Sequence, residues 1–206
     1  MLREWAEHHL LDRQQDVADF LAFCLPRMKP AFYSAEWMPR WAFRDGTLLE
    51  DHQEKGTRFA PLMFHVNDPI MDQDLQSLVN HWHDENGHAR VLNGTPPGLC
   101  IHMSRLVGEV NPVKDCKHMD ISSHIALPCY VDDAIKWHGY TLIAISYHLG
   151  PSFHSGHWRT IIWQGMPWNR WLNYEDGMLP EKSTHIPEVV LSNWCVVWLA
   201  MEPRFE

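Results

Sequence analysis

The sequence lacks the cysteine patterns of a zinc ribbon and of a disulfide scaffold. Its 206 residues include five cysteines, and no two of them form a Cys-x-x-Cys pair. A zinc ribbon needs thiolates that are paired at short spacing. An odd number of widely spaced cysteines is instead typical of a reducing compartment. We therefore expect an intracellular protein rather than a secreted one.

The sequence also lacks a targeting segment and a membrane span. Its first fifteen residues, MLREWAEHHLLDRQQ, contain no apolar core of a signal peptide. The longest apolar run, residues 194–201, is far shorter than the roughly 20 residues that a helix needs to cross a bilayer. We therefore expect a soluble protein that does not associate with membranes.

Positive charge is scarce as well. Lys and Arg number 17 against 26 Asp and Glu, which gives a formal net charge of −9. This balance argues against a nucleic-acid partner and against an anionic membrane surface, because both attract basic proteins. It is compatible with a basic protein partner. The length and the 45% of hydrophobic residues are sufficient for one domain with a sizeable core, so we expect a single domain over residues 1–206.

The first clear element is an amphipathic helix, predicted over residues 12–25. Asp12 can cap its N-terminus, Gln15 follows three residues later, and Pro26 ends it. One stripe of this helix is apolar, with side chains recurring at i, i+3, i+4, i+7 and i+8: Val17, Phe20, Leu21, Cys24 and Leu25.

Most of the remaining chain has the pattern of β-strands. Irregular residues 26–58 precede a strand at 59–66, and a short helix is predicted over 74–82. Beyond the break at NGTPPG, alternating apolar and polar residues predict further strands at 99–103, 118–126, 139–148, 157–164, 168–174 and 193–201. Helices that precede a mostly antiparallel meander predict an α+β fold.

A candidate catalytic pair lies in the last third of the chain. Gly156 precedes His157 at the start of a predicted strand, and a glycine leaves open space beside the imidazole. If strands 157–164 and 168–174 form a hairpin, Glu175 or Asp176 returns to the vicinity of His157. A carboxylate there would fix the tautomer of the imidazole and stabilise its cation. A structural histidine beside an ordinary turn also fits these residues.

A histidine-rich stretch, HWHDENGH, invites a metal-site interpretation. It contains His81, His83 and His88. Residues at i and i+2 do not face each other on a helix, and no fourth ligand is evident. We therefore interpret the stretch as polar surface, and we expect no metal and no cofactor.

Five segments resemble, in order, the motifs of the ubiquitin-specific proteases. RQQDVADFL, with Gln14, Gln15 and Asp16, resembles their Gln-Gln-Asp helix, and PPGLCIHMSRL resembles the strand that ends in an arginine. YTLIAISYHLGPSFHSGHWRTIIW is similar to their histidine box, which we place at 150–163. WLNYEDG resembles the acidic stretch that follows the histidine box, and NWCVVWLAM resembles the closing strand.

The resemblance implies a papain-like cysteine protease fold that cleaves the bond after the C-terminal glycine of ubiquitin. It implies a thumb-type helix at 12–25 and a β palm over 59–206. It further implies that His157 is the catalytic base, with Glu175 orienting it and Asp176 as the second acidic residue. The ubiquitin tail would be bound by residues of the helix box and the histidine box: Gln14, Gln15, Asp16, Gly156 and Trp158.

Several positions depart from the family pattern. The Gly-Asn-Thr-Cys-Tyr box lies well upstream of the Gln-Gln-Asp helix in the family, and no cysteine precedes Arg13 here. Trp158 replaces a tyrosine, Glu175 replaces the usual aspartate, and the paired zinc cysteines of the fingers are absent. We therefore expect a partial domain without its nucleophile. The alternatives are a non-catalytic module that binds ubiquitin or ubiquitinated proteins, and an unrelated α+β binding domain.

Overall fold

The computed structural model of the chain describes residues 17–24, 27, 36–38, 40–42, 48–50, 57–58, 62–67, 72–84, 89–108, 113–152 and 155–202. The helices of this part are α2 (Val17–Cys24), α3 (Leu75–His83) and α4 (Glu188–Leu191). The strands of its first half are β1 (Glu36–Met38), β2 (Arg40–Ala42), β3 (Leu48–Glu50), β4 (Thr57–Arg58), β5 (Leu62–His65), β6 (Val91–Asn93), β7 (Gly98–Ser104), β8 (Leu106–Val107) and β9 (Val113–Lys114). The strands of its second half are β10 (His124–Val131), β11 (Ala134–Ser152), β12 (Ser155–Gln164), β13 (Arg170–Tyr174), β14 (Glu181–Ser183) and β15 (Trp194–Met201).

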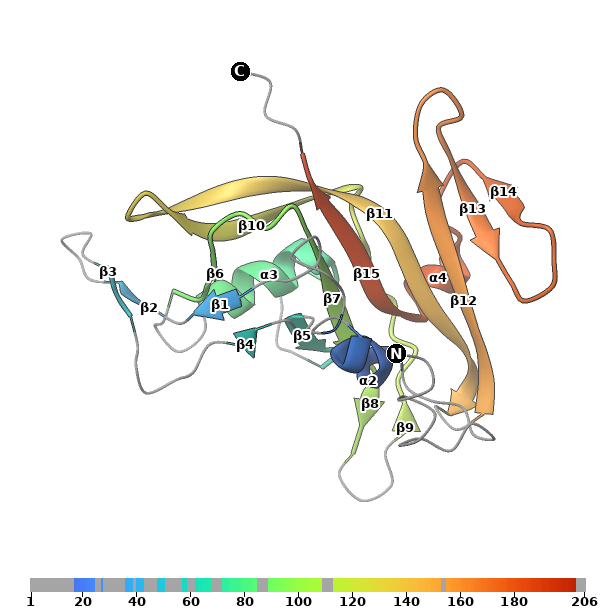
Figure 1. The fold of residues 1–206 in the computed structure, drawn as a ribbon. Coiled ribbons are helices and arrows are strands. Elements are labelled where there is room, and N and C mark those ends of the chain that lie inside the picture. Colours follow the sequence, from blue (N-terminus) through green and yellow to red (C-terminus); the bar gives the residue numbers. More distant parts are fainter. Residues whose placement is uncertain are drawn as a thin grey trace.

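Within the described residues, one 11-stranded sheet dominates the fold. Its main path runs β14-β13-β12-β11-β10-β6-β1-β4, and β15 joins β11 to β7, which in turn pairs with β5. The pairings of β10 with β6 and of β5 with β7 are parallel, and the others are antiparallel. Figure 1 shows β11 crossing the sheet from its hairpin with β10 to its hairpin with β12.

The two faces of the central strands bury different helices. In β15, Val197 and Leu199 belong to the main core, whereas Val196 belongs to a second, smaller cluster with Leu21 of α2. Successive side chains of a strand point to opposite faces, so α3 and α2 pack on opposite sides of the sheet. No helix in the described part of the chain is both long and apolar enough to span a membrane.

Helix α3 forms where the periodicity predicts a helix. Asp74 is its N-cap, and the Asp74 carboxylate accepts a hydrogen bond of 2.9 Å from the amide of Ser77. The buried side chains recur at i, i+3, i+4 and i+7: Leu75, Leu78, Val79 and Trp82. Burying each large apolar side chain contributes about 1.5–3 kcal/mol, so this stripe fixes the helix on the sheet.

The structure corrects several predicted boundaries. The strand expected at 118–126 begins only at His124, and residues 118–123 are irregular apart from a bridge at Asp120. Part of the segment 26–58, expected to be irregular, contains the short strands β1 to β4. The elements that the sequence did not predict are all two to four residues long, which is too short for a periodic signal: β6, β8, β9, β14 and α4.

A histidine joins the irregular segment 118–123 to helix α4. His118 places Nε2 at 2.9 Å from the Asp120 carboxylate and Nδ1 at 2.7 Å from the Glu188 carboxylate. Only the doubly protonated ring donates to both carboxylates. The hydrogen bond to Asp120 raises the pKa of His118; slight burial opposes this, and Glu188 adds to it.

This histidine predicts a pH dependence of stability. The pKa of His118 is higher in the folded state than in the unfolded state. His118 therefore stabilises the fold fully below its unfolded-state pKa of about 6.5, and this stabilisation is lost as pH rises through its folded-state pKa. We expect His118→Gln to lower the free energy of unfolding by up to about 1 kcal/mol near pH 6, and by less at pH 9. Urea unfolding of the wild type and the variant at both pH values measures this difference. An equal loss at both pH values would contradict the prediction.

Candidate active site

His157 lies near the start of β12, opposite the last regular residues of β11. In the antiparallel register, Leu149 pairs with His157 and His148 pairs with Trp158. The register shifts between Leu149 and Ser152, so the hairpin is irregular immediately beside His157. The histidine is therefore placed by a bulged hairpin end rather than by a regular ladder.

Gly156 allows the two strands to approach closely at this point. Its φ angle is +153°, and a Cβ atom there would lie 2.1 Å from the carbonyl oxygen of Leu149. The same Cβ would lie 2.6 Å from the ring of His148. Only glycine fits this position without displacing backbone, and this is the physical role of the Gly-His pair in the sequence.

The β12–β13 hairpin brings Glu175 to His157. Thr160 pairs with Tyr174, so the chain leaves β13 beside the first half of β12. Nε2 of His157 lies 3.6 Å from Oε1 of Glu175. This is ion-pair distance but longer than a hydrogen bond, so the imidazole and the carboxylate face each other without being bonded.

Arg159 holds the carboxylate of Glu175 more tightly than His157 does. Its Nη2 lies 2.7 Å from the same Oε1 atom. Burial lowers the pKa of Arg159, but its hydrogen bonds to Glu175 and Tyr147 outweigh this effect, and the net pKa is raised. In this structure the carboxylate is therefore bonded to the guanidinium, and His157 is its second neighbour.

The side chain of His157 is buried at Nε2 and exposed elsewhere. The Nε2 atom is buried and forms no hydrogen bond, although 39% of the side chain is exposed. The exposure therefore comes from side-chain atoms other than Nε2. In the tautomer that carries its proton on Nε2, towards the carboxylate, Nδ1 is the nitrogen that can accept a proton.

Asp176 and Trp158 are two further predicted site residues that the structure describes, and neither side chain bonds to His157 or Glu175. Asp176 is exposed in the turn after Glu175, and no interaction joins it to His157. Trp158 is half-buried, its ring lies 4.9 Å from that of His148, and its Nε1 atom has no hydrogen-bond acceptor in the described residues. Gln14, Gln15 and Asp16 lie outside the described residues.

All five cysteines lie in the described residues, and none of them interacts with His157. Four are buried: Cys24, Cys100, Cys129 and Cys195. Burial raises the pKa of Cys100 to about 12 and also raises the pKa of Cys24, so neither thiol forms a thiolate readily. Cys116 is exposed, and its Sγ atom lies 3.6 Å from Oδ1 of Asn193. No group of three or more His, Cys, Asp or Glu among the described residues is arranged to hold a metal ion.

Arg159 is the site residue that sequence reasoning missed. It lies two positions after His157 on the same strand, so the two side chains share one face of the sheet. Glu175 lies on that face too, because Thr160 and Tyr174 are paired on the other. The period-two rule applied to the histidine box would have placed a guanidinium beside the predicted acid.

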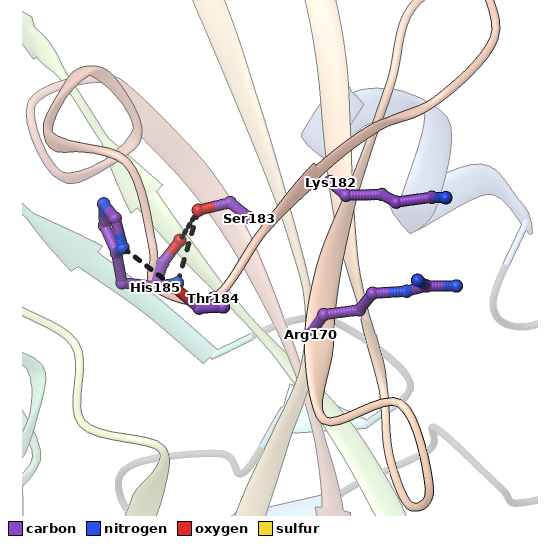
Figure 2. A pocket seen from close by; sticks show the side chains of 5 residues that line it. All are labelled: Arg170, Lys182, Ser183, Thr184 and His185. Carbon is purple, nitrogen blue, oxygen red and sulfur yellow. Dashed lines mark hydrogen bonds between the residues drawn. The ribbon is translucent and has the colours of Figure 1, made fainter.

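A surface pocket of about 380 Å³ lies elsewhere, at β13 and β14. Figure 2 shows its lining residues: Arg170, Lys182, Ser183, Thr184 and His185. The charged ends of Arg170 and Lys182 extend in one direction, away from the turn formed by the other three. The polar groups do not converge, and none of the predicted site residues is among them.

The bulged histidine hairpin beside a carboxylate on an antiparallel sheet is the arrangement expected of a papain-like hydrolase. The family model of ubiquitin carboxyl-terminal hydrolase matches residues 1–192. The chain therefore belongs to the ubiquitin carboxyl-terminal hydrolase family, and its domain is of the ubiquitin-specific protease type. This confirms the resemblance seen in the motifs.

Solved structures confirm the fold. The SAGA Ubp8/Sgf11/Sus1/Sgf73 DUB module bound to ubiquitin aldehyde matches with a TM-score of 0.66 at 15% identity, over 93% of this chain and 50% of that chain. An Ubp8 variant in the SAGA DUB module bound to monoubiquitin gives 0.62 at 15% identity, over 93% and 49%. A yeast SAGA DUB module with a mutant Sgf73 gives 0.61 at 15% identity, over 84% and 39%.

These likenesses show an α+β, papain-like fold, as predicted. The chain spans half or less of the length of each of these three chains. No curated protein matches the chain.

Proposed function

We propose that the chain provides the palm and the catalytic histidine of a ubiquitin-specific protease, which hydrolyses the bond after the C-terminal glycine of ubiquitin. The observation that carries this proposal is the geometry of His157, whose buried Nε2 faces Glu175 while 39% of the side chain is exposed. Two of the similar structures bind ubiquitin aldehyde and monoubiquitin, which supports ubiquitin as the partner. A role in ubiquitin processing also agrees with an intracellular location.

In this mechanism His157 takes the proton of a cysteine thiol through Nδ1. The thiolate sulfur then bonds to the carbonyl carbon of the terminal glycine of ubiquitin, and the imidazolium gives the proton to the leaving amine. Water hydrolyses the thioester and restores the thiol. Glu175 stabilises the imidazolium once His157 is charged, and Arg159 holds Glu175 in place. Four of the five cysteines are buried, and the thiol of Cys116 contacts Asn193. This supports a nucleophile that is supplied by a segment outside this sequence.

A second function, non-catalytic recognition of ubiquitin, is favoured by one specific observation. The carboxylate of Glu175 is bonded to Arg159 at 2.7 Å and lies 3.6 Å from His157. A carboxylate that is shared in this way orients the imidazole less firmly than a carboxylate that is hydrogen-bonded to it directly. The same palm surface would still receive the ubiquitin tail.

Two measurements separate these functions. Titration of the chain with ubiquitin by NMR tests binding, and ubiquitin without its last two glycines is the matched control. We expect binding that weakens about tenfold or more when the tail is shortened, since the tail enters beside His157. The native protein is then treated with ubiquitin carrying a thiol-reactive C-terminal electrophile. An adduct supports the protease, binding without an adduct supports the recognition module, and no binding at high micromolar concentration would contradict both.

A further inference from the structure

The hairpin that carries His157 extends beyond the strand that supports it. The pairing of β11 with β15 ends at Tyr147 and Trp194, and the amide of His148 donates a last hydrogen bond of 3.2 Å to the carbonyl of Asn193. Figure 1 shows the β11–β12 hairpin continuing past the start of β15. The outer carbonyls of β11 in this extension therefore require partners that a strand does not supply.

Lys114 supplies these partners. It lies on β9, it is 7% exposed, and its ammonium group donates to the carbonyl of His148 and, at 3.4 Å, to that of Gly150. A third bond of 2.7 Å goes to Oδ1 of Asn193. The three protons of the ammonium group thus have three oxygen acceptors, two of them in the extended hairpin.

The Lys114 ammonium is held by neutral oxygens, because no carboxylate of the described residues forms an ion pair with it. Burial lowers the pKa of Lys114, and this is the largest effect. Cys116 and Cys195 raise the pKa and partly offset burial, whereas Arg105 lowers it further. Desolvating a buried cation costs free energy. An apolar residue could pack at this position without that cost, so packing alone does not account for a lysine here. The specific acceptors point to a role in fixing the hairpin.

Arg105 fixes the segments that surround Lys114 and Asn193. Its buried guanidinium donates to the carbonyls of Trp194, Lys117, Asp115 and Leu191, at distances of 2.7 to 3.2 Å. These bonds join the segment after β9 to the turn before β15. Asn193, which shares the ammonium of Lys114, lies in that turn. The Lys114 ammonium therefore connects the turn held by Arg105 to the β11–β12 hairpin.

We propose that Lys114 is a positioning residue for His157, acting through the backbone of residues 148–150. The carbonyls that its ammonium binds lie on either side of Leu149, and Leu149 is the residue paired with His157. Fixing this stretch of β11 fixes the start of β12, and with it the distance from His157 to Glu175. The inference rests on the proposed function only for the role of His157 as the base.

Hydrogen exchange of the Lys114→Met variant tests the inference. The substitution keeps the length of the side chain but removes its donors, leaving buried acceptors unpaired. We expect amide exchange in residues 148–152 and 155–159 to become about tenfold faster or more, with no change in residues 196–199 of the central strand. Lys136→Met is the control, since Lys136 lies on β11, is exposed and, among the described residues, pairs with Asp132.

Unchanged exchange in the hairpin, or equal acceleration in the hairpin and the central strand, would overturn the inference. If Lys114→Met does not fold, Asn193→Ala removes one of the three acceptors of Lys114, together with the bonds of Asn193 to Val189 and Cys116. The same segments should then exchange about threefold faster. In the native enzyme, Lys114→Met should lower kcat by a larger factor than it raises KM, because the base is displaced from the reacting thiol. Hydrogen exchange can be measured whether or not the protein is active. Failure of this inference can therefore be distinguished from failure of the proposed function.

Discussion

Replacing His157 with glutamine should lower kcat/KM for a ubiquitin conjugate by about 10³-fold or more, without unfolding the native enzyme. General acid–base catalysis contributes about 10²–10⁴-fold, and a thiol without its base is mostly protonated near neutral pH. The Nε2 atom of His157 forms no hydrogen bond, and 39% of the side chain is exposed, so its loss leaves few groups unpaired. Hydrolysis of a fluorogenic ubiquitin conjugate, together with thermal unfolding, measures the two effects.

The matched control is His185→Gln. His185 is also exposed, and it lies beyond β14 in the surface pocket rather than beside Glu175. We expect this variant to retain wild-type activity. An equal loss of activity in both variants would show a general defect, and wild-type activity of His157→Gln would remove His157 from the catalytic site.

Replacing Gly156 with alanine should destabilise the native fold by about 3 kcal/mol. The new Cβ would lie 2.1 Å from the Leu149 carbonyl oxygen and 2.6 Å from the His148 ring, and the φ angle of +153° disfavours any side chain. Because Leu149 pairs with His157, the strands must separate where the histidine is held. Urea unfolding measures the loss of stability, and the exchange rates of residues 148–152 and 155–159 locate it.

Gly177→Ala distinguishes the steric clash from the backbone conformation. Gly177 has a φ angle of +68°, and a Cβ there would meet no atom within 4 Å. Gly177→Ala should lower the free energy of unfolding by about 1 kcal/mol, which is the cost of the left-handed backbone conformation for a residue with a Cβ atom. Similar losses for the two glycines would contradict the close approach of β11 and β12.

The sequence predicted the parts of the site that follow from local pattern. Helix α3 and the β12–β13 hairpin arise from periodic apolar residues and a turn between them, so their positions could be inferred within a few residues. The proximity of Glu175 to His157 followed from that hairpin. Asp176, predicted with it, points into solvent because the chain turns after Glu175.

The sequence could not predict contacts between distant segments. Lys114 and Asn193 are 79 residues apart, and a lone lysine in a polar loop is normally solvated. The burial of such a residue is a tertiary property without a local signal.

The position of β15 has a consequence for folding during synthesis. This strand is among the last residues of the described chain, yet it lies between β11 and β7, with a buried side chain at most of its positions. Until it emerges from the ribosome, β7 and β11 each present an open apolar edge, which is a template for pairing with other chains. The sheet therefore closes at its centre only once β15 has been synthesised, and chaperones that cover exposed strands should be needed most before that point.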